Sequence, residues 1–202
     1  MKLSELFYET LHADYVHLDS GADYAISREG DTLYIYFEAS DGATDWKNNL
    51  DFPAMRKGGS LLHRGFLRVF ESVRPVVSAV ASEREIDSIV ISGYSHGGAL
   101  AVLCYDEVLH LRPELCGKIV GYGFGTPRVF FGIKTRRLAR RFADFTVIRN
   151  TDDLVTHLPP RALGYFHVGK LLTVGDRGKY SRIDAHRPEN IMRELLAYEK
   201  KK

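Results

Sequence analysis

Apolar positions along the chain follow two repeating patterns, and their order predicts an architecture. Helical spacing and composition predict helices over residues 2–12, 65–80, 99–110, 134–142 and 188–198. Short runs of β-branched and aromatic side chains predict strands over residues 24–27, 32–37, 86–92, 118–124, 145–149, 165–168 and 170–174. Because strands alternate with helices, we expect an α/β fold with a mostly parallel central sheet flanked by helices.

Local features refine this pattern. The run over residues 86–92 lacks a strict alternation of polar and apolar side chains, as is typical of a central strand covered on both faces. Pro75 lies inside the helix predicted over residues 65–80 and is a candidate for a kink or a restart there. No repeat, low-complexity tract or linker interrupts the pattern, so we expect a single domain over residues 1–202.

Composition and charge exclude two classes of function. A net charge of +2 and an isoelectric point near 8.5 are too mild for a typical nucleic-acid-binding domain. The longest apolar runs, such as residues 99–104, fall far short of the roughly 18 residues that a membrane span needs. We therefore expect no nucleic-acid partner and no integral membrane segment.

The first residues and the cysteines indicate a reducing compartment. Glu5 and Glu9 interrupt the apolar core that a secretory leader needs, so the sequence predicts a cytoplasmic location. Cys104 and Cys116 lie in apolar stretches, which favours buried free thiols. A single disulfide between them is the alternative.

Residues 93–97, with the sequence Gly-Tyr-Ser-His-Gly, match the GxSxG nucleophile elbow. In this motif a serine sits on a sharp turn between a strand and a helix, and the flanking glycines leave room for the strained backbone. The strand predicted before Ser95 and the helix predicted after it supply that context. The alternative is a glycine-rich turn whose serine only caps a helix.

A serine hydroxyl becomes a good nucleophile when a histidine takes its proton and a carboxylate orients that histidine. In chains with this elbow, the acid follows a later strand and the histidine lies near the end. Asp152 and Asp153 directly follow the strand predicted over residues 145–149, and His186 precedes the last helix. A solvated turn carboxylate and an exposed loop histidine are the alternatives.

Several further motifs occur in a fixed order, at residues 45–46, 63–66, 93–98, 125–129, 153–160, 166–169 and 185–186. Together they resemble the class 3 lipases, the fungal-type lipase family of α/β-hydrolases. The resemblance covers the chain from about Leu33 to Leu196. It implies that Ser95 is the nucleophile, Asp153 the orienting acid and His186 the general base and later acid. Asp152 is the fallback for the acid.

Two backbone donors are expected to form the oxyanion hole. The residue after the nucleophile, His96, should offer its backbone N–H. The family places the second donor in a segment resembling Phe-Arg-Gly-Ser, to which residues 37–40 correspond, so the resemblance assigns this role to Ser40. Glu38 and Ala39 depart from the Arg-Gly of the family.

The family often places a mobile lid between the positions of Ser40 and His63. Here that stretch holds few apolar side chains, namely Trp46, Leu50, Phe52 and Met55. We therefore expect a small or absent lid and weak activation by lipid interfaces. Trp46 is expected to anchor the loop by packing, and Gly58-Gly59 to allow some movement.

Other chemistry-bearing residues have simpler interpretations. His167 lies on a predicted strand and is expected to be a structural, hydrogen-bonding histidine. A basic cluster beside Phe130-Phe131 is interpreted as a solvated helix face, with attraction to an anionic membrane as the alternative: Lys134, Arg136, Arg137, Arg140 and Arg141. No HExxH or CxxC spacing occurs, so we expect no metal site.

The resemblance implies a serine carboxylic-ester hydrolase, a lipase or esterase that acts on acylglycerols or other lipid esters through an acyl-serine intermediate. Its partners would be a lipid or small ester substrate and, transiently, a lipid surface; no cofactor is implied. A phospholipase, lysophospholipase or acyltransferase with the same triad is an alternative, because these differ in the leaving group or acceptor. An inactive hydrolase-fold binding module is the alternative from another class.

Overall fold

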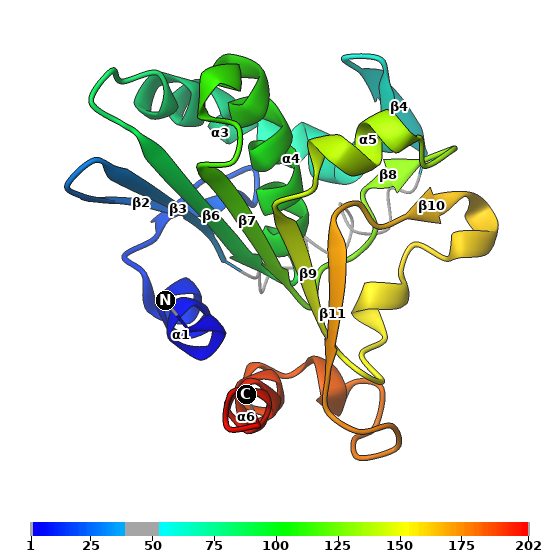
Figure 1. Cartoon of the computed structure of the whole chain (residues 1–202). Coiled ribbons are helices and arrows are strands. Elements are labelled where there is room, and N and C mark those ends of the chain that lie inside the picture. The colour runs from blue at the N-terminus through cyan, green and yellow to red at the C-terminus, as the bar shows by residue number, and fades with distance from the viewer. Residues whose placement is uncertain (1, 39–52, 202) are drawn as a thin grey trace.

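A seven-stranded sheet forms the centre of the computed structural model, which describes residues 2–38 and 53–201 (Figure 1). Its strands, in spatial order, are β1 (Val16–His17), β2 (Asp23–Glu29), β3 (Thr32–Phe37), β6 (Ser88–Tyr94), β7 (Ile119–Phe124), β9 (Phe145–Asn150) and β11 (Lys170–Val174). Strands β3 to β11 in this order are parallel, whereas β1 and β2 pair antiparallel. The predicted mostly parallel sheet is confirmed.

The register brings the carboxyl ends of the central strands to one edge of the sheet. Phe37 at the end of β3 lies opposite Gly93, and Tyr94 at the end of β6 lies opposite Phe124. Phe124 in turn lies opposite Ile148 on β9. Residues that follow these strands therefore emerge side by side, although they are far apart in the sequence.

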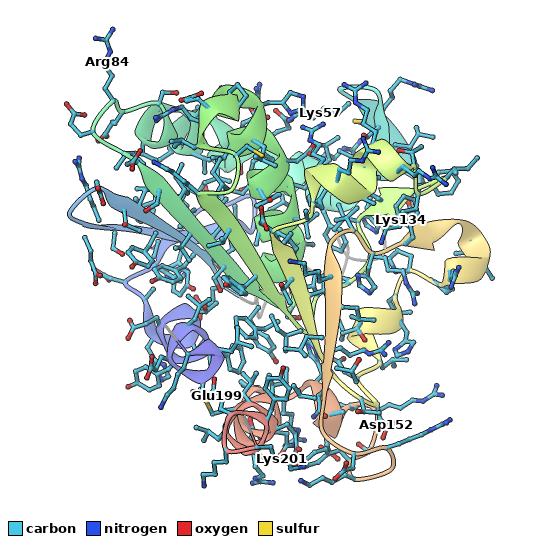
Figure 2. All side chains as sticks on the ribbon, in the orientation of Figure 1. Lys57, Arg84, Lys134, Asp152, Glu199 and Lys201 are labelled. Atoms are coloured by element: carbon cyan, nitrogen blue, oxygen red, sulfur yellow. The ribbon has the colours of Figure 1, made fainter. Side chains whose placement is uncertain are left out.

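Helices cover both faces of the sheet (Figure 1). One face carries α1 (Leu3–His12) and α6 (Pro188–Glu199), which are joined by a 2.6 Å hydrogen bond from Ser4 Oγ to the Glu199 carboxylate (Figure 2). The other face carries α3 (Arg64–Ala81) and α4 (His96–Leu111). A short helix, α5 (Arg136–Arg141), precedes β9.

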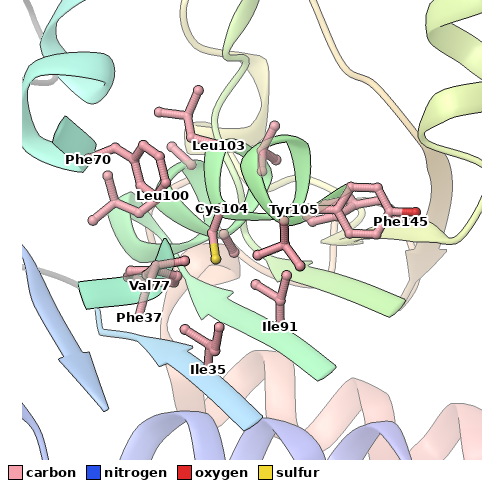
Figure 3. Close-up of a cluster of buried hydrophobic side chains, with 14 of the residues drawn as sticks. Ile35, Phe37, Phe70, Val77, Ile91, Leu100, Leu103, Cys104, Tyr105 and Phe145 are labelled. Atoms are coloured by element: carbon pink, nitrogen blue, oxygen red, sulfur yellow. The ribbon is translucent and has the colours of Figure 1, made fainter. Parts of the chain in front are cut away.

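Two hydrophobic clusters, one on each face, result from the alternation of side chains along the strands. On β3, Ile35 and Phe37 belong to the cluster with α3 and α4, whereas Tyr36 between them belongs to the cluster with α1 and α6. Figure 3 shows Ile35 and Phe37 beneath the buried side chains of α4. A sheet buried on both faces explains why the central strand shows no strict alternation.

A second, antiparallel sheet was not predicted. Its spatial order is β10 (Tyr165–Phe166), β8 (Phe130–Phe131), β5 (Ser60–His63) and β4 (Ala54–Lys57). Gly58 and Gly59, with φ of 55° and 84°, form the two-residue turn between β4 and β5. Two adjacent glycines between short strands are a typical hairpin signal, and it was available in the sequence.

Local differences from the expected elements have simple causes. Pro75 neither ends nor restarts α3, which continues to Ala81. Proline leaves one helix carbonyl group without a partner, but Pro75 lies on the exposed side, where solvent can bond that group. Helix α4 begins directly after Ser95 rather than at residue 99. Both cysteines are free thiols; Cys104 is buried, but Cys116 is exposed because it lies in the loop between α4 and β7.

Short 3₁₀ helices make several of the connections, namely Pro113–Leu115, Val155–His157, Arg161–Leu163 and Asp184–His186. The helix Val155–His157 follows Asp153 closely, and the helix Asp184–His186 contains His186 and precedes α6. Among the described residues, no helix is both long enough and apolar enough to cross a membrane.

Candidate active site

Ser95 occupies a strained turn between β6 and α4. Its φ of 54° is the one positive value among the non-glycine residues of the described ranges, and its ψ is −120°. Such a conformation costs free energy that the surrounding fold must supply, and it is typical of functional sites. The turn places the serine at the carboxyl edge of the sheet, immediately before the first turn of α4.

The glycine two residues after Ser95 permits a close approach between two segments. A Cβ atom at Gly97 would lie 2.3 Å from the carbonyl oxygens of both Phe37 and Glu38. The backbone at the end of β3 therefore packs directly on the first turn of α4. Ser40, to which the sequence assigns the second oxyanion donor, and Trp46 lie outside the described residues.

Three side chains from distant parts of the chain form a hydrogen-bonded row. His186 Nε2 lies 2.8 Å from Ser95 Oγ, and His186 Nδ1 lies 2.9 Å from Asp153 Oδ2. Both distances are those of good hydrogen bonds. In the tautomer that suits this row, Nδ1–H donates to the carboxylate and Nε2 accepts from the hydroxyl. The structure thus brings together the three residues that the sequence singled out.

The carboxylate of Asp153 is fully buried and firmly held. Its exposed fraction is 0%, and Oδ1 accepts a 2.9 Å hydrogen bond from the Val155 backbone N–H. The Thr156 hydroxyl donates to the Asp153 carbonyl oxygen at 2.8 Å. The neighbouring Asp152 turns elsewhere and accepts a hydrogen bond from the backbone N–H of Gly178. Of the two adjacent acids, Asp153 is the one in contact with His186.

Two side chains that the sequence analysis did not select hold the loop of His186. The Tyr94 hydroxyl donates to the His186 carbonyl oxygen at 2.7 Å, and the two rings stack with their centres 5.2 Å apart. Asn150 Nδ2 donates to the Ala185 carbonyl oxygen at 3.0 Å. Tyr94 lies within the elbow motif and Asn150 directly follows the strand predicted over residues 145–149, so their positions were the signals that the sequence offered.

Gly125, in the loop after β7, is a further positioning residue. Its φ is +58°, and a Cβ atom there would lie 2.8 Å from His186 Cε1 and 3.1 Å from Asp153 Oδ2. A side chain would therefore need both a strained backbone and space that the hydrogen-bonded row already occupies. Gly125 belongs to one of the ordered motifs in the sequence, but its role is visible only in the structure.

His96, the first residue of α4, supplies a backbone N–H in the first helical turn. The first N–H groups of a helix have no partner within the helix and lie at the positive end of its dipole. They can therefore stabilise negative charge that develops beside Ser95. The His96 ring is buried and meets the Phe66 ring edge-on at 5.4 Å.

His167 has the structural role that the sequence predicted, although it lies just after β10 rather than on a strand. Its Nε2–H donates to the Thr156 carbonyl oxygen at 2.8 Å. Burial lowers the pKa of His167 to about 4, so this histidine is neutral near pH 7. It supports the segment that follows Asp153.

One group in the described part of the chain has a composition that could hold a cation. His17, Asp23 and Glu38 offer ligand atoms within 4.8 Å of one another at the β1–β2–β3 edge of the sheet. Two of these atoms, His17 Nδ1 and Asp23 Oδ1, already face each other at 2.9 Å. Partly exposed groups of this kind are common without a metal, and the Ser95 row needs none.

Solved lipase structures share this architecture, the α/β-hydrolase fold. A structure described as a triacylglycerol lipase whose catalytic centre is a serine protease triad aligns with a TM-score of 0.68 and 25% identity, over 81% of this chain and 66% of that chain. A fungal lipase–inhibitor complex, described as a model for interfacial activation, aligns with a TM-score of 0.71 and 22% identity, over 85% of this chain and 78% of that chain. The predicted fold is confirmed.

Similar sequences are also named lipases. A lipase of Rhizomucor miehei is 28% identical over 166 residues, which are 78% of this chain and 46% of the relative. A secreted mono- and diacylglycerol lipase of Malassezia restricta is 33% identical over 124 residues, which are 57% of this chain and 38% of the relative. The chain thus spans less than half the length of these relatives.

The predicted cytoplasmic location is wrong. The similar lipases of Malassezia restricta and Fusarium solani are both named as secreted proteins. The prediction rested on the composition of the first residues of this chain, which spans only 38% and 45% of these two relatives.

The match to a family model is consistent with these relatives and runs through the structural core. The model for lipase (class 3) matches residues 34–163, which is well over half of the chain. This range begins on β3, passes through Ser95 and the elbow, and includes Asp153. The chain belongs to the class 3 lipase family.

Proposed function

We propose that this chain is a serine carboxylic-ester hydrolase that cleaves lipid esters through an acyl-serine intermediate. The observation that carries the proposal is the continuous row from Ser95 Oγ through His186 to the buried Asp153 carboxylate, with distances of 2.8 and 2.9 Å. A hydroxyl, an imidazole and a carboxylate in this order are the groups that nucleophilic acyl transfer requires.

In the acylation half-reaction, Ser95 Oγ attacks the carbonyl carbon of the ester while His186 Nε2 takes the hydroxyl proton. The imidazolium that forms is stabilised by Asp153, which stays ionised. Collapse of the tetrahedral intermediate breaks the bond to the alcohol, which leaves with the proton from His186. The products of this half-reaction are the free alcohol and an ester between the acyl group and Ser95.

In the deacylation half-reaction, His186 accepts a proton from water, whose oxygen attacks the acyl-serine carbonyl. The second tetrahedral intermediate releases the carboxylic acid and returns the proton to Ser95. The backbone N–H of His96 would stabilise the negative oxygen in both halves. Ser40 is proposed as the second donor, because the chain reaches it two residues beyond Glu38, whose carbonyl group packs against Gly97.

The substrates proposed are acylglycerols and related lipid esters. The relatives support this class, because their names describe triacylglycerol and mono- and diacylglycerol lipases. A small or absent lid remains part of the proposal. The lid position falls mainly on residues 39–52, which lie outside the described residues. If the lid is small, the hydrolysis rate should not jump when the substrate passes its solubility limit.

A direct test compares the wild type with Ser95→Ala on chromogenic esters from acetate to palmitate. Ser95→Ala should lower kcat at least about 1000-fold on every ester that the wild type cleaves. Ser82→Ala, at the exposed end of α3, is a matched control that should leave kcat unchanged. The chain-length profile of the wild type then separates an esterase from a lipase.

The alternatives give different results in the same assay. Hydrolysis that persists in Ser95→Ala contradicts the nucleophile, and a wild type without activity on any ester favours an inactive binding module. Product analysis on phospholipid, and on ester with glycerol as acceptor, distinguishes a phospholipase or an acyltransferase from a lipase.

A further inference from the structure

A cation-rich face lies on the second sheet and α5. Two segments of the sequence, residues 53–70 and 126–143, contain four and six Lys or Arg residues and no Asp or Glu. The whole chain carries a net charge of only +2, so positive charge is concentrated in these segments. Acids of α3 and α4 balance part of it, because Lys57 pairs with Glu71 and Arg141 pairs with Asp106. Both segments meet in space, because β5 pairs with β8 directly before α5.

Several cations of this face have no partner within the described residues. Four exposed arginines have neither an ion pair nor a side-chain hydrogen bond there: Arg56, Arg136, Arg137 and Arg140. Cations on other faces are commonly paired, for example Arg28 with Glu83 and Lys118 with Asp87. Unpaired arginines remain available to a partner that carries negative charge.

A groove of about 450 Å³ runs between the β4–β5 hairpin and α5. Its lining includes the arginines Arg56, Arg137 and Arg141 and the apolar side chains Phe130, Leu138 and Phe166. Cationic and apolar groups therefore face the same space. This combination suits an amphiphile with an anionic head better than a small hydrophilic anion.

The loop between β8 and α5 places an apolar side chain among these cations. Ile133 is 86% exposed, and the residue after it is Lys134, which Figure 2 shows beside α5 and β10. A bulky aliphatic side chain followed by basic residues can enter the interfacial layer of a membrane while the cations contact headgroup phosphates. A nucleic acid would contact the cations but offer no apolar layer to Ile133.

We propose that this face, made of the β4–β5 hairpin, the β8–α5 loop and α5, docks on an anionic lipid surface. The proposal goes beyond ester hydrolysis, because it assigns a membrane-contact face and a headgroup charge. Packed residues connect this face with the candidate site, because β5 runs from the groove to His63. The His63 ring stacks on Phe66, whose ring contacts His96 next to Ser95.

Vesicle sedimentation tests the proposal without any ester cleavage. The probes are vesicles of ether-linked phosphatidylglycerol, or of ether-linked phosphatidylcholine, which an ester hydrolase cannot cleave. The wild type should bind the anionic vesicles at least about 10-fold more tightly than the neutral ones. A triple variant in which glutamine replaces Arg136, Arg137 and Arg140 should lose most of that binding, because each charge removed should weaken the affinity about 5-fold. Ile133→Ser should weaken it by about 10-fold.

The matched control removes three charges elsewhere, with Arg28→Gln, Arg84→Gln and Lys118→Gln combined, and should leave vesicle binding within about 3-fold of the wild type. Hydrolysis of a soluble short-chain ester reports on the active site of each variant, so failure of docking is distinguishable from failure of the proposed hydrolysis. Equal binding to both vesicle types, or equal losses in both triple variants, overturns the proposal. Binding to duplex DNA through the same arginines without vesicle binding overturns it too.

Discussion

The two halves of the candidate active site are positioned in different ways. Ser95 is held by its immediate neighbours, because a strand, a strained turn and a helix follow one another within residues 88–111. His186 lies in a short 3₁₀ helix and is held by contacts from the ends of three other segments: Tyr94, Gly125 and Asn150.

This difference shows that one motif can indicate the position of a site without determining where all its side chains lie. The elbow fixes Ser95, the proposed nucleophile, through local backbone geometry, whereas the position of His186, the proposed base, depends on the register of β6, β7 and β9. A substitution that shifts the end of β7 or β9 should impair His186 and leave Ser95 in place, whereas the end of β6 adjoins Ser95 itself. The comparison therefore predicts losses of activity from residues that touch neither the substrate nor Ser95.

Among these positioning residues, the largest loss of kcat is expected from Gly125→Ala. The added Cβ atom would lie 2.8 Å from His186 Cε1, so the imidazole must move away from Ser95 or Asp153. A displacement of about 1 Å at a catalytic group can cost about 100-fold in rate. We expect kcat on a soluble ester to fall by about that factor or more.

Gly117→Ala is the matched control for this prediction. Its φ of +85° imposes a comparable backbone strain, but a Cβ atom there would meet nothing within 4 Å. It should lower the thermal stability and leave kcat per folded molecule unchanged. Equal kcat losses in the two variants would show that strain alone, not the His186 contact, explains the effect.

A smaller effect is expected from Tyr94→Phe, which removes the hydrogen bond to the His186 carbonyl but keeps the ring stack. A typical hydrogen bond contributes about 1 kcal/mol, so we expect a kcat loss of about 3- to 10-fold. Tyr15→Phe removes a comparable bond to the Thr10 carbonyl oxygen, which is not part of the Ser95–His186–Asp153 row, and should change only the stability. An unchanged kcat in Tyr94→Phe would mean that the loop of His186 needs no such support.

The smallest effect on activity is expected from His167→Gln, which should instead change the pH dependence of folding stability. The folded state keeps His167 neutral until its pKa of about 4, whereas the unfolded chain takes up the proton near the ordinary pKa of 6.5. Folding stability should therefore fall as pH decreases through this window, by up to about 2 to 3 kcal/mol from this group.

The variant should lose that part of the pH dependence, because glutamine can donate to Thr156 and does not titrate. Urea unfolding at pH 7 and pH 4 measures the difference for both proteins. Parallel curves for wild type and variant would contradict a buried neutral His167.

Much of the main sheet could be predicted from the sequence, because its strands are compact apolar runs between helices with a clear period. The strand over residues 170–174 is confirmed with its bounds, and helix α6 differs at its end by a single residue. Most of the second sheet could not be predicted in this way, although β10 lies within the strand predicted over residues 165–168. Its strands are two to four residues long, and they exist through pairing with one another rather than through a periodic pattern.

The residues of the candidate site likewise fall into those that the sequence could indicate and those that it could not. Ser95 follows from a local motif, and Asp153 and His186 follow from chain order together with the family resemblance. Gly125 and Asn150 could not be assigned, because their roles depend on distances between segments up to about 60 residues apart in the sequence. The family resemblance already preferred Asp153 to Asp152, but without it the choice depends on which way each side chain turns after β9.

Covalent labelling measures whether Ser95, His186 and Asp153 act as one unit. The wild type and His186→Ala are incubated with a serine-directed fluorophosphonate, and the modified peptide is mapped by mass spectrometry over time. A single adduct on Ser95, formed at least about 100-fold more slowly in His186→Ala, is the expected result. An adduct on another residue, or labelling of Ser95 at the same rate in both proteins, would show that the three residues do not act as one unit.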